Sequence, residues 1–185
     1  YQGQAISVSP RPAASMLDRQ ARFMRHLEKL GRLDRAIEYL PTDKEIAERK
    51  TRAEGLTTPE FAVLLAYSKM WLSDELVASD LPEDPWVATA LQEYFPPLLR
   101  EKFAAWIPRH PLKREIIATQ VLNRMVNRVG ASFVHRLTEI SGAKPAQIVR
   151  AFLAAREVFG LEALWQQIEA LDNVVDDAVQ SALLI

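Results

Sequence analysis

The chain has 185 residues, of which 49% are hydrophobic and 25% are charged, and these values are typical of a globular protein with a good-sized core. A formal net charge of −1 excludes a global attraction to nucleic acid or to an anionic membrane, and the longest apolar run, residues 61–67, is far shorter than the roughly 20 residues of a membrane span. The absence of cysteine excludes disulfides and thiolate metal sites and fits a reducing cytoplasm.

The N-terminal residues 1–14 contain Gly3, Pro10 and Pro12 without periodicity, and this pattern predicts a linker or an extended arm. Residues 15–185 are predicted to form a helical domain. The chain begins at Tyr1 rather than at Met and stops inside an apolar run, so we expect it to be a fragment of a longer polypeptide, which we call the parent protein.

A helix is predicted from Ser15 to Gly31, because its apolar residues recur at three-and-four spacing. Four of its cations fall within an arc of roughly 120°, and we call them the basic face: Arg19, Arg22, Arg25 and Lys29. Such a stripe is usually a solvated helix surface. The alternative interpretation is a docking face for an acidic surface elsewhere in the parent protein.

Two helix starts are marked by their capping residues. A short helix is expected at 33–40, and the run 42–45 (Thr-Asp-Lys-Glu) then fits a capping box for a charged helix. The run 57–60 (Thr-Thr-Pro-Glu) opens the next helix, with proline in the first turn. The core contacts expected on this next helix are Phe61, Leu64, Leu65, Met70 or its neighbour Trp71, and Leu72.

The remaining chain continues as helices divided by glycine and proline. Helices are expected at 85–95, 97–107, 111–130, 132–140, 145–159, 161–171 and 172–185. No stretch alternates with period two, so no β-sheet is expected. The predicted fold class is therefore all-α, an irregular bundle of about eight to ten helices.

The helix predicted at 111–130 is expected to be the central element of this bundle. Pro111 suits its first turn, and Gly130 suits the left-handed position after its end. One continuous apolar arc contains Ala118, Val121, Leu122, Met125, Val126 and Val129, and Ile116 and Ile117 extend it. We therefore expect this helix to be buried on more than one side.

Polar residues on the same helix form a candidate buried network, namely Arg114, Glu115, Asn123 and Asn127. Charges inside or beside an apolar arc need partners if they are buried. A structural hydrogen-bond network between helices is favoured over a binding site. Glu101, Glu139 and Glu157 are the candidate partners, and the sequence does not choose among them.

No catalytic, cofactor-binding or metal-binding residue is predicted. His26, His110 and His135 are far apart and lack metal-ligand spacing, although His110 is expected to cap a helix. The chain has neither a glycine-rich phosphate loop nor the motif of an activated serine. The run 172–177 faintly resembles a magnesium-binding aspartate box, but Asp172 as a helix cap is the simpler interpretation.

Five blocks of sequence, taken in order, carry a resemblance to a known family. They are GRLDRAIEYLP, EGLTTPEFAVLLAYSKMWLSDEL, YFPPLLREKF, HPLKREIIATQVLNRMVNRVG and AREVFGLEALWQQIEALD. Together they resemble the C-terminal region of the large bacterial NAD-specific glutamate dehydrogenases. The resemblance runs from about Leu17 to the end of the chain, and the arm before it matches less clearly.

The resemblance implies that the parent protein is a cytoplasmic, oligomeric oxidoreductase, which converts L-glutamate and NAD to 2-oxoglutarate, ammonia and NADH. Its catalytic and dinucleotide-binding motifs have no match in this chain, so the fragment is expected to be inactive and to hold no cofactor. Its expected partners are the catalytic domain of the same polypeptide and neighbouring subunits, with no nucleic acid and no membrane. The alternatives are a stand-alone helical protein-interaction module and a small helical lyase that uses the run 172–177.

Overall fold

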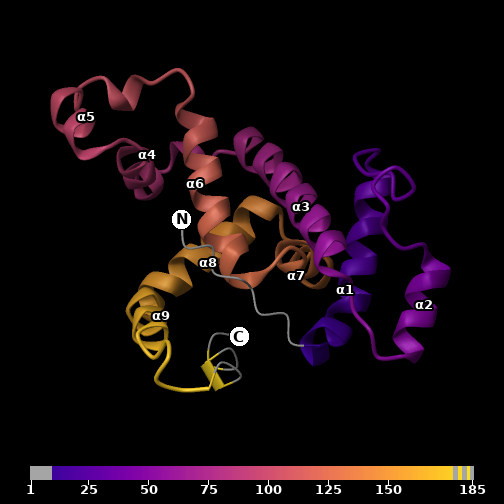
Figure 1. Ribbon diagram of the computed structural model, residues 1–185. Helices are drawn as coiled ribbons and strands as arrows, with labels where there is room; N and C mark the ends of the chain where they lie inside the picture. Colours follow the sequence, from indigo (N-terminus) through magenta and orange to yellow (C-terminus); the bar gives the residue numbers. More distant parts are fainter. Residues whose placement is uncertain (1–9, 177–178, 181–182, 184–185) are drawn as a thin grey trace. The chain divides into compact units, whose positions relative to one another are not determined.

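The computed structural model describes residues 10–176, 179–180 and 183. Within these residues it contains nine α-helices, three short 3₁₀-helices and no strand (Figure 1). The predicted all-α fold class is thereby confirmed. Among the described residues, no helix is both long enough and apolar enough to span a bilayer.

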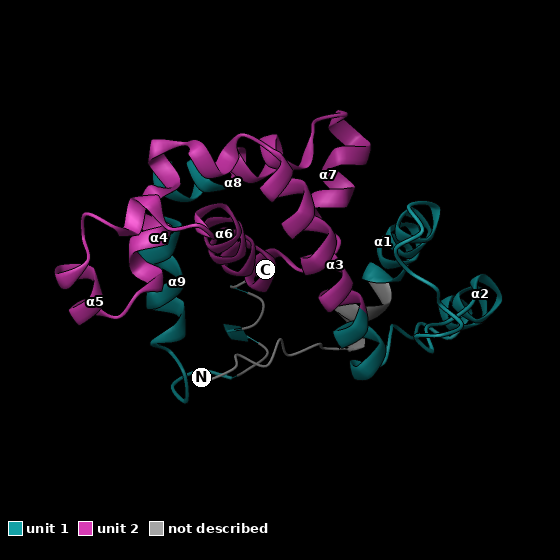
Figure 2. Ribbon diagram, turned by 90° about the horizontal axis from the view of Figure 1, so that it is seen from above, with its two compact units in different colours: residues 1–63, 153–185 teal, residues 64–152 magenta. Residues whose placement is uncertain are grey.

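The contacts of the chain divide it into two compact units, coloured separately in Figure 2. Unit 1 consists of residues 1–63 and 153–185, and unit 2 consists of residues 64–152. Each unit is described by itself below. The predicted domain limits, an arm at 1–14 and a helical domain at 15–185, stay a prediction.

Unit 1 begins with helix α1, Pro10–Lys29. The helix starts at Pro10 rather than at the expected Ser15, because Pro10 and Pro12 both lie in the first turn, where a missing N–H has no intrahelical acceptor to lose. One side of α1 is fully buried, and its largest buried residues are Leu17, Phe23, Met24 and Leu27. Residues 1–9 of the predicted arm lie outside the described residues.

The helix predicted at 33–40 is wrong, because this segment forms turns. Its residues fold around Arg35, whose guanidinium donates to Glu28 at 2.8 and 2.9 Å, to Asp43 at 3.0 Å and to the Pro41 carbonyl at 3.1 Å. Tyr39 adopts a positive φ of 53°, which a regular helix does not allow. Side-chain contacts to Arg35 therefore decide the local structure, rather than helix propensity.

Helix α2, Asp43–Thr51, follows a confirmed capping box. The Thr42 hydroxyl accepts from the Glu45 N–H, and the Glu45 carboxylate accepts from the Thr42 N–H at 2.8 Å. α2 contacts α1, and Ile46 is its one buried residue. A helix this charged is fixed at its start by capping and on one side by a single apolar contact.

Helix α3, Thr58–Ala78, begins in unit 1 and continues into unit 2. The Thr57 N–H donates to the Glu60 carboxylate at 2.7 Å, and Glu60 also receives a bidentate pair from Arg49 at 2.6 and 2.7 Å. The residues buried along α3 are Leu64, Ser68, Trp71, Leu72 and Leu76. Of the two alternatives for the core position, Trp71 is correct, since Met70 is exposed.

In unit 2, α3 is followed by a run of short elements. They are η1 (Leu81–Glu83), η2 (Pro85–Val87), α4 (Ala88–Tyr94), α5 (Pro97–Lys102) and η3 (Ile107–Arg109). Prolines begin several of them, because a fixed φ near −65° suits a first turn. The helix expected at 97–107 ends early, at Lys102.

Helix α6, Lys113–Val129, is the most deeply buried helix of unit 2 and contacts α4, η1 and η3. Its buried residues are Ile116, Ile117, Ala118, Val121, Leu122, Met125 and Val126, which confirms the predicted arc except for the half-buried Val129. It begins two residues after Pro111, because the Leu112 N–H donates to His110 Nδ1 at 3.1 Å instead of continuing a helical ladder. Gly130 ends it with a φ of 81°.

Three further helices follow α6, namely α7 (Phe133–Ser141), α8 (Pro145–Val158) and α9 (Leu161–Glu169). They agree with the helices expected at 132–140, 145–159 and 161–171 within two residues at each end. Inside unit 2, the buried Ser68 hydroxyl donates to the Ala131 carbonyl at 2.7 Å and joins α3 to the turn before α7.

Candidate functional site

The basic face of α1 lies in unit 1. Arg22, Arg25 and Lys29 are exposed, and Arg19 is half-buried with a contact to the sulfur of Met16 at 3.5 Å. Arg25 donates to the Asp43 carboxylate at 3.3 Å. Lys29 has no charged partner among the described residues. All four cations lie along one helix, but they differ in how strongly neighbouring groups hold them.

Two carboxylates lie beside the basic face and partly neutralise it. Asp18 accepts from Lys50 at 2.7 Å, and this hydrogen bond, helped by the charges of Arg22 and Arg25, lowers the pKa of Asp18. Arg35 lowers the pKa of Asp43 in the same way, chiefly through its hydrogen bond. These carboxylates therefore neutralise the middle of the face, around Arg22 and Arg25.

The four residues of the predicted polar network take separate places in unit 2. Glu115 and Asn127 are exposed, and Asn123 is half-buried. Asn127 accepts a hydrogen bond from Lys69 at 3.0 Å. Arg114 turns toward η1, and its partner is Glu83 rather than Glu101, Glu139 or Glu157.

Two arginines hold the segment 79–84 in place. Arg114 donates to Glu83 at 2.8 Å and to the carbonyls of Val77 and Ser79 at 2.8 and 2.5 Å. Arg150 of α8 donates to Asp80 at 2.8 Å and to Asp84 at 2.7 Å. Because one segment is bonded from two helices, these ion pairs fasten η1 in unit 2.

The electrostatics of this segment follow from the same contacts. Hydrogen bonds from Lys113, at 2.6 Å, and from Arg114 lower the pKa of Glu83. The hydrogen bond from Arg150 lowers the pKa of Asp80. The charged residues here hold one another in a structural arrangement. Sequence reasoning missed Glu83, because nothing local in the sequence pairs it with residues about thirty positions away.

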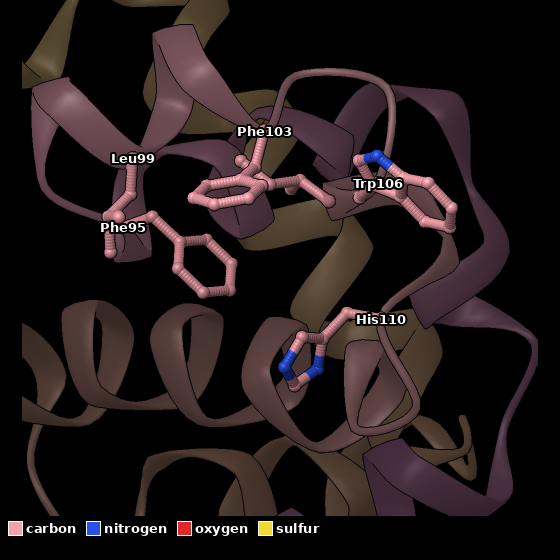
Figure 3. A pocket seen from close by; sticks show the side chains of 6 residues that line it. Phe95, Leu99, Phe103, Trp106 and His110 are labelled. Atoms are coloured by element: carbon pink, nitrogen blue, oxygen red, sulfur yellow. The ribbon is translucent and has the colours of Figure 1, made fainter.

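An apolar pocket lies between the end of α4 and η3, and sequence reasoning did not identify it. Its volume is about 240 Å³, and it is lined by Phe95, Leu99, Phe103, Trp106, Ile107 and His110. The rings of Phe95, Phe103 and His110 face a common space, and Trp106 lies at its edge (Figure 3). The polar groups of this lining belong to the His110 imidazole and the Trp106 indole.

The aromatic contacts explain how the pocket keeps its shape. The rings of Phe95 and His110 are 5.6 Å apart, and Tyr94 meets Phe95 edge-on at 5.2 Å. Arg100 donates through Nε to the Phe95 carbonyl at 2.8 Å and braces the chain between α4 and α5. The lining is suited to apolar or aromatic groups, and the sequence signal that could have found it is the density of large apolar residues between Phe95 and Ile107.

The other histidines and the aspartate-rich run do not form a metal site in the part of the chain that the structure describes. His135 is buried, with Nδ1 at 3.7 Å from the Glu139 carboxylate. Asp172 lies in the turn after α9 and does not begin a helix as expected, because Asn173 there takes a φ of 61°. The Asp176 carbonyl instead accepts from the N–H of Val179 and Gln180. Asp177 lies outside the described residues.

Comparison with known proteins gives a consistent result. A family model described as "Glutamate dehydrogenase, C-terminal" matches residues 53–185. The chain is 44% identical over 177 residues to the NAD-specific glutamate dehydrogenase of Halomonas elongata, in an alignment that covers 93% of the chain and 11% of that protein. It is 42% identical over 183 residues to the NAD-specific glutamate dehydrogenase of Pseudomonas aeruginosa, covering 99% of the chain and 11% of that protein.

A third relative is the NAD-specific glutamate dehydrogenase of Mycobacterium tuberculosis, 37% identical over 169 residues, with 91% of the chain and 10% of that protein covered. The chain therefore spans about a tenth of the length of the curated relatives it matches.

Proposed function

Because this chain belongs to the family of glutamate dehydrogenase C-terminal regions, we propose that it is the helical, non-catalytic C-terminal domain of an NAD-dependent glutamate dehydrogenase. The parent protein would convert L-glutamate and NAD to 2-oxoglutarate, ammonia and NADH. The observation that carries this proposal is the match of nearly the whole chain to relatives of that name. The parent protein would work in the cytoplasm, and the lack of cysteine is compatible with a reducing compartment.

The non-catalytic role is supported by what the charged residues do. Glu83, Asp80 and Glu60 are each engaged by arginines that join separate segments. A catalytic acid or base needs to reach a substrate, whereas these carboxylates are occupied by structural ion pairs. NAD would be bound by the parent protein outside this chain.

The first test concerns chemistry. The parent protein, expressed from its complete reading frame, is expected to reduce NAD with L-glutamate as substrate. The present chain alone is expected neither to turn over glutamate nor to bind NAD at millimolar concentration in calorimetry. Cofactor binding by the isolated chain would contradict the non-catalytic assignment, and a start codon directly before this chain would favour the stand-alone interaction module instead.

We also propose that the basic face of α1 docks on an acidic surface of the catalytic domain or of a neighbouring subunit. The chain has a net charge of −1, but four cations lie on one helix, so positive charge is concentrated on one surface of the domain. A domain tethered to a larger protein can use such a surface to dock in one orientation. Single surface pairs contribute only about 0–1 kcal/mol, so the combined effect carries the test.

The test of this docking uses Arg19, Arg22, Arg25 and Lys29, all changed to Glu in the full-length parent protein. We expect altered assembly or activity at low salt. Since Arg25 contacts Asp43, a smaller variant, Arg22→Gln with Lys29→Gln, leaves that ion pair in place. Lys44→Gln, on the exposed part of α2, removes one positive charge outside the basic face and is the control. Unchanged assembly and activity of the fourfold variant would leave the stripe as solvated surface.

A further inference from the structure

Helix α5 lacks the features that usually stabilise a helix. It has six residues, and none of them is buried. Isolated helices shorter than about 12–15 residues are marginal in water, and helices in proteins gain most of their stability by burying one face. Local constraints hold α5 instead, namely Pro97 in its first turn and the hydrogen bond from Arg100 to the Phe95 carbonyl.

Large apolar side chains gather around α5 and remain in contact with solvent. Leu98 is 80% exposed and Trp106 is 67% exposed. The exposed large apolar residues between the end of α4 and η3 are Tyr94, Leu98, Leu99, Phe103 and Trp106. Such a concentration on a folded protein marks an interaction site. We call Leu98, Leu99, Phe103, Trp106 and the adjoining apolar pocket the α5 surface.

The size and lining of the pocket indicate what it accepts. Small-molecule sites occupy about 300–1,000 Å³. At about 240 Å³, with five apolar side chains and one histidine, this pocket suits one or two inserted side chains better than a cofactor. Aromatic side chains in such pockets carry much of the binding energy of protein interfaces. The occupant is therefore a protein segment with an apolar anchor.

The charges around the α5 surface indicate the sign of the charge that the docking segment carries. Arg100, Lys102 and Arg109 oppose a single carboxylate, Glu101, so this region is positive in a chain whose net charge is −1. The ammonium group of Lys102 lies 5.5 Å from the centre of the Phe103 ring, at the edge of the apolar area. A partner whose anchor is flanked by carboxylates would meet these cations favourably.

We propose that the α5 surface is the docking site of an acidic segment with an apolar anchor that lies in the same parent polypeptide, outside this chain. This inference rests on the proposed function. About nine-tenths of the length of the matching relatives lies outside the aligned region, which supplies ample sequence for such a segment. A second copy of the same surface is a poorer occupant, since a symmetric contact would bring its cations together.

The first experiment is site-specific photo-crosslinking in the full-length parent protein. A benzophenone amino acid replaces Leu98, and the control replaces Ile140, which is 71% exposed on α7. The Leu98 probe is expected to crosslink to a carboxylate-rich peptide outside these 185 residues. Crosslinks to a second copy of this chain, identified by mixing isotope-labelled subunits, would overturn the proposal, as would a Leu98 probe that forms no crosslink.

The second experiment measures amide hydrogen exchange over residues 97–107 of the same protein. Two variants are tested separately, Trp106→Ala and the double variant Lys102→Glu with Arg109→Glu. The first removes an anchor of the interface and the second removes its charge complementarity, so each is expected to speed exchange in this segment by about tenfold or more. Lys44→Glu, a single charge reversal in unit 1, is the control and should change nothing in this segment. Unprotected amides in the unaltered protein would contradict the proposal.

Glutamate oxidation is assayed on the same preparations to separate the two proposals. If the protein is an active dehydrogenase but its α5 amides are unprotected, the docking proposal is contradicted and the proposed function stands. A protein without glutamate-dependent NAD reduction would instead contradict the proposed function. Protected amides together with a crosslink to an acidic segment support the docking site.

Discussion

Helices α6 and α5 belong to the same unit and are both rich in apolar residues, but they differ in how much of their apolar surface is buried. α6 buries seven residues, whereas α5 buries none. The difference lies in length and spacing, because seventeen residues can align an apolar arc on one side of a helix and six cannot. Burial of apolar side chains stabilises α6, whereas Pro97 and the hydrogen bond from Arg100 to the Phe95 carbonyl hold α5 in place.

This contrast separates two uses of apolar residues. The arc of α6 supplies the core of unit 2, and its position follows from the hydrophobic effect alone. The apolar residues around α5 are excluded from that core, so their stabilisation within this chain is small. The stability of α6 and the exposure of α5 can therefore be tested separately.

The largest effect is expected from Leu122→Ala. Leu122 is 2% exposed at the middle of the α6 arc, and its truncation leaves a cavity that should cost about 2–5 kcal/mol of unfolding free energy. Urea unfolding of the chain measures this as a lower midpoint. A midpoint that barely moves would place the core of unit 2 elsewhere.

A smaller effect is expected from Arg114→Gln at the start of α6. This change removes the ion pair with Glu83 and leaves the carbonyls of Val77 and Ser79 without that donor. Because charged hydrogen bonds contribute about 1.5–3 kcal/mol and this side chain is partly exposed, we expect a loss of roughly 1–2 kcal/mol. Arg109→Gln, an exposed arginine nearby, is the matched control for urea unfolding.

The pH dependence of stability should show the same ion pair. The folded pKa of Glu83 lies below its ordinary value of 4.5, so its contribution is complete above that pH and is lost as the pH falls through the folded pKa. Urea midpoints measured between pH 7 and pH 3 should fall less steeply below pH 4.5 for Glu83→Gln than for the unaltered chain. Equal slopes would show that Glu83 is not coupled to folding.

The smallest effect is expected from Leu98→Ala on α5. Since Leu98 is 80% exposed, its truncation should change the unfolding free energy of the chain by less than about 0.5 kcal/mol. The same volume change at Leu122 is the internal standard. A loss comparable to that of Leu122→Ala would mean that α5 is part of the core, and the contrast between the two helices would fail.

The parts of the fold that were predictable are those set by local sequence. The arc of α6 and the Thr42 capping box depend on residues within a few positions of one another, and both were confirmed. The segment 33–40 has helical composition, but Arg35 is bonded to Glu28 and Asp43, and such contacts override propensity.

The candidate sites were less predictable for the same physical reason. The Arg114–Glu83 pair joins residues distant in sequence, and the apolar pocket exists only because the chain turns between Phe95 and His110. A list of charged residues on a helix wheel cannot supply either arrangement. The basic face of α1 was readable from one helix, but its docking role depends on surfaces outside this chain.

The hydrogen bonds of Arg35 to Glu28, to Asp43 and to the Pro41 carbonyl have a practical consequence for protein engineering. They fix both ends of the turn at 33–40, while Ile37 and Tyr39 at the tip are 69% and 90% exposed. Lengthening such a loop costs only about 0.6 kcal/mol for each doubling. The tip between Ile37 and Glu38 is thus a position for inserting a peptide tag into the full-length parent protein, at the loss of the hydrogen bonds that the N–H groups of Glu38 and Leu40 donate across it to the carbonyls of Asp34 and Arg35.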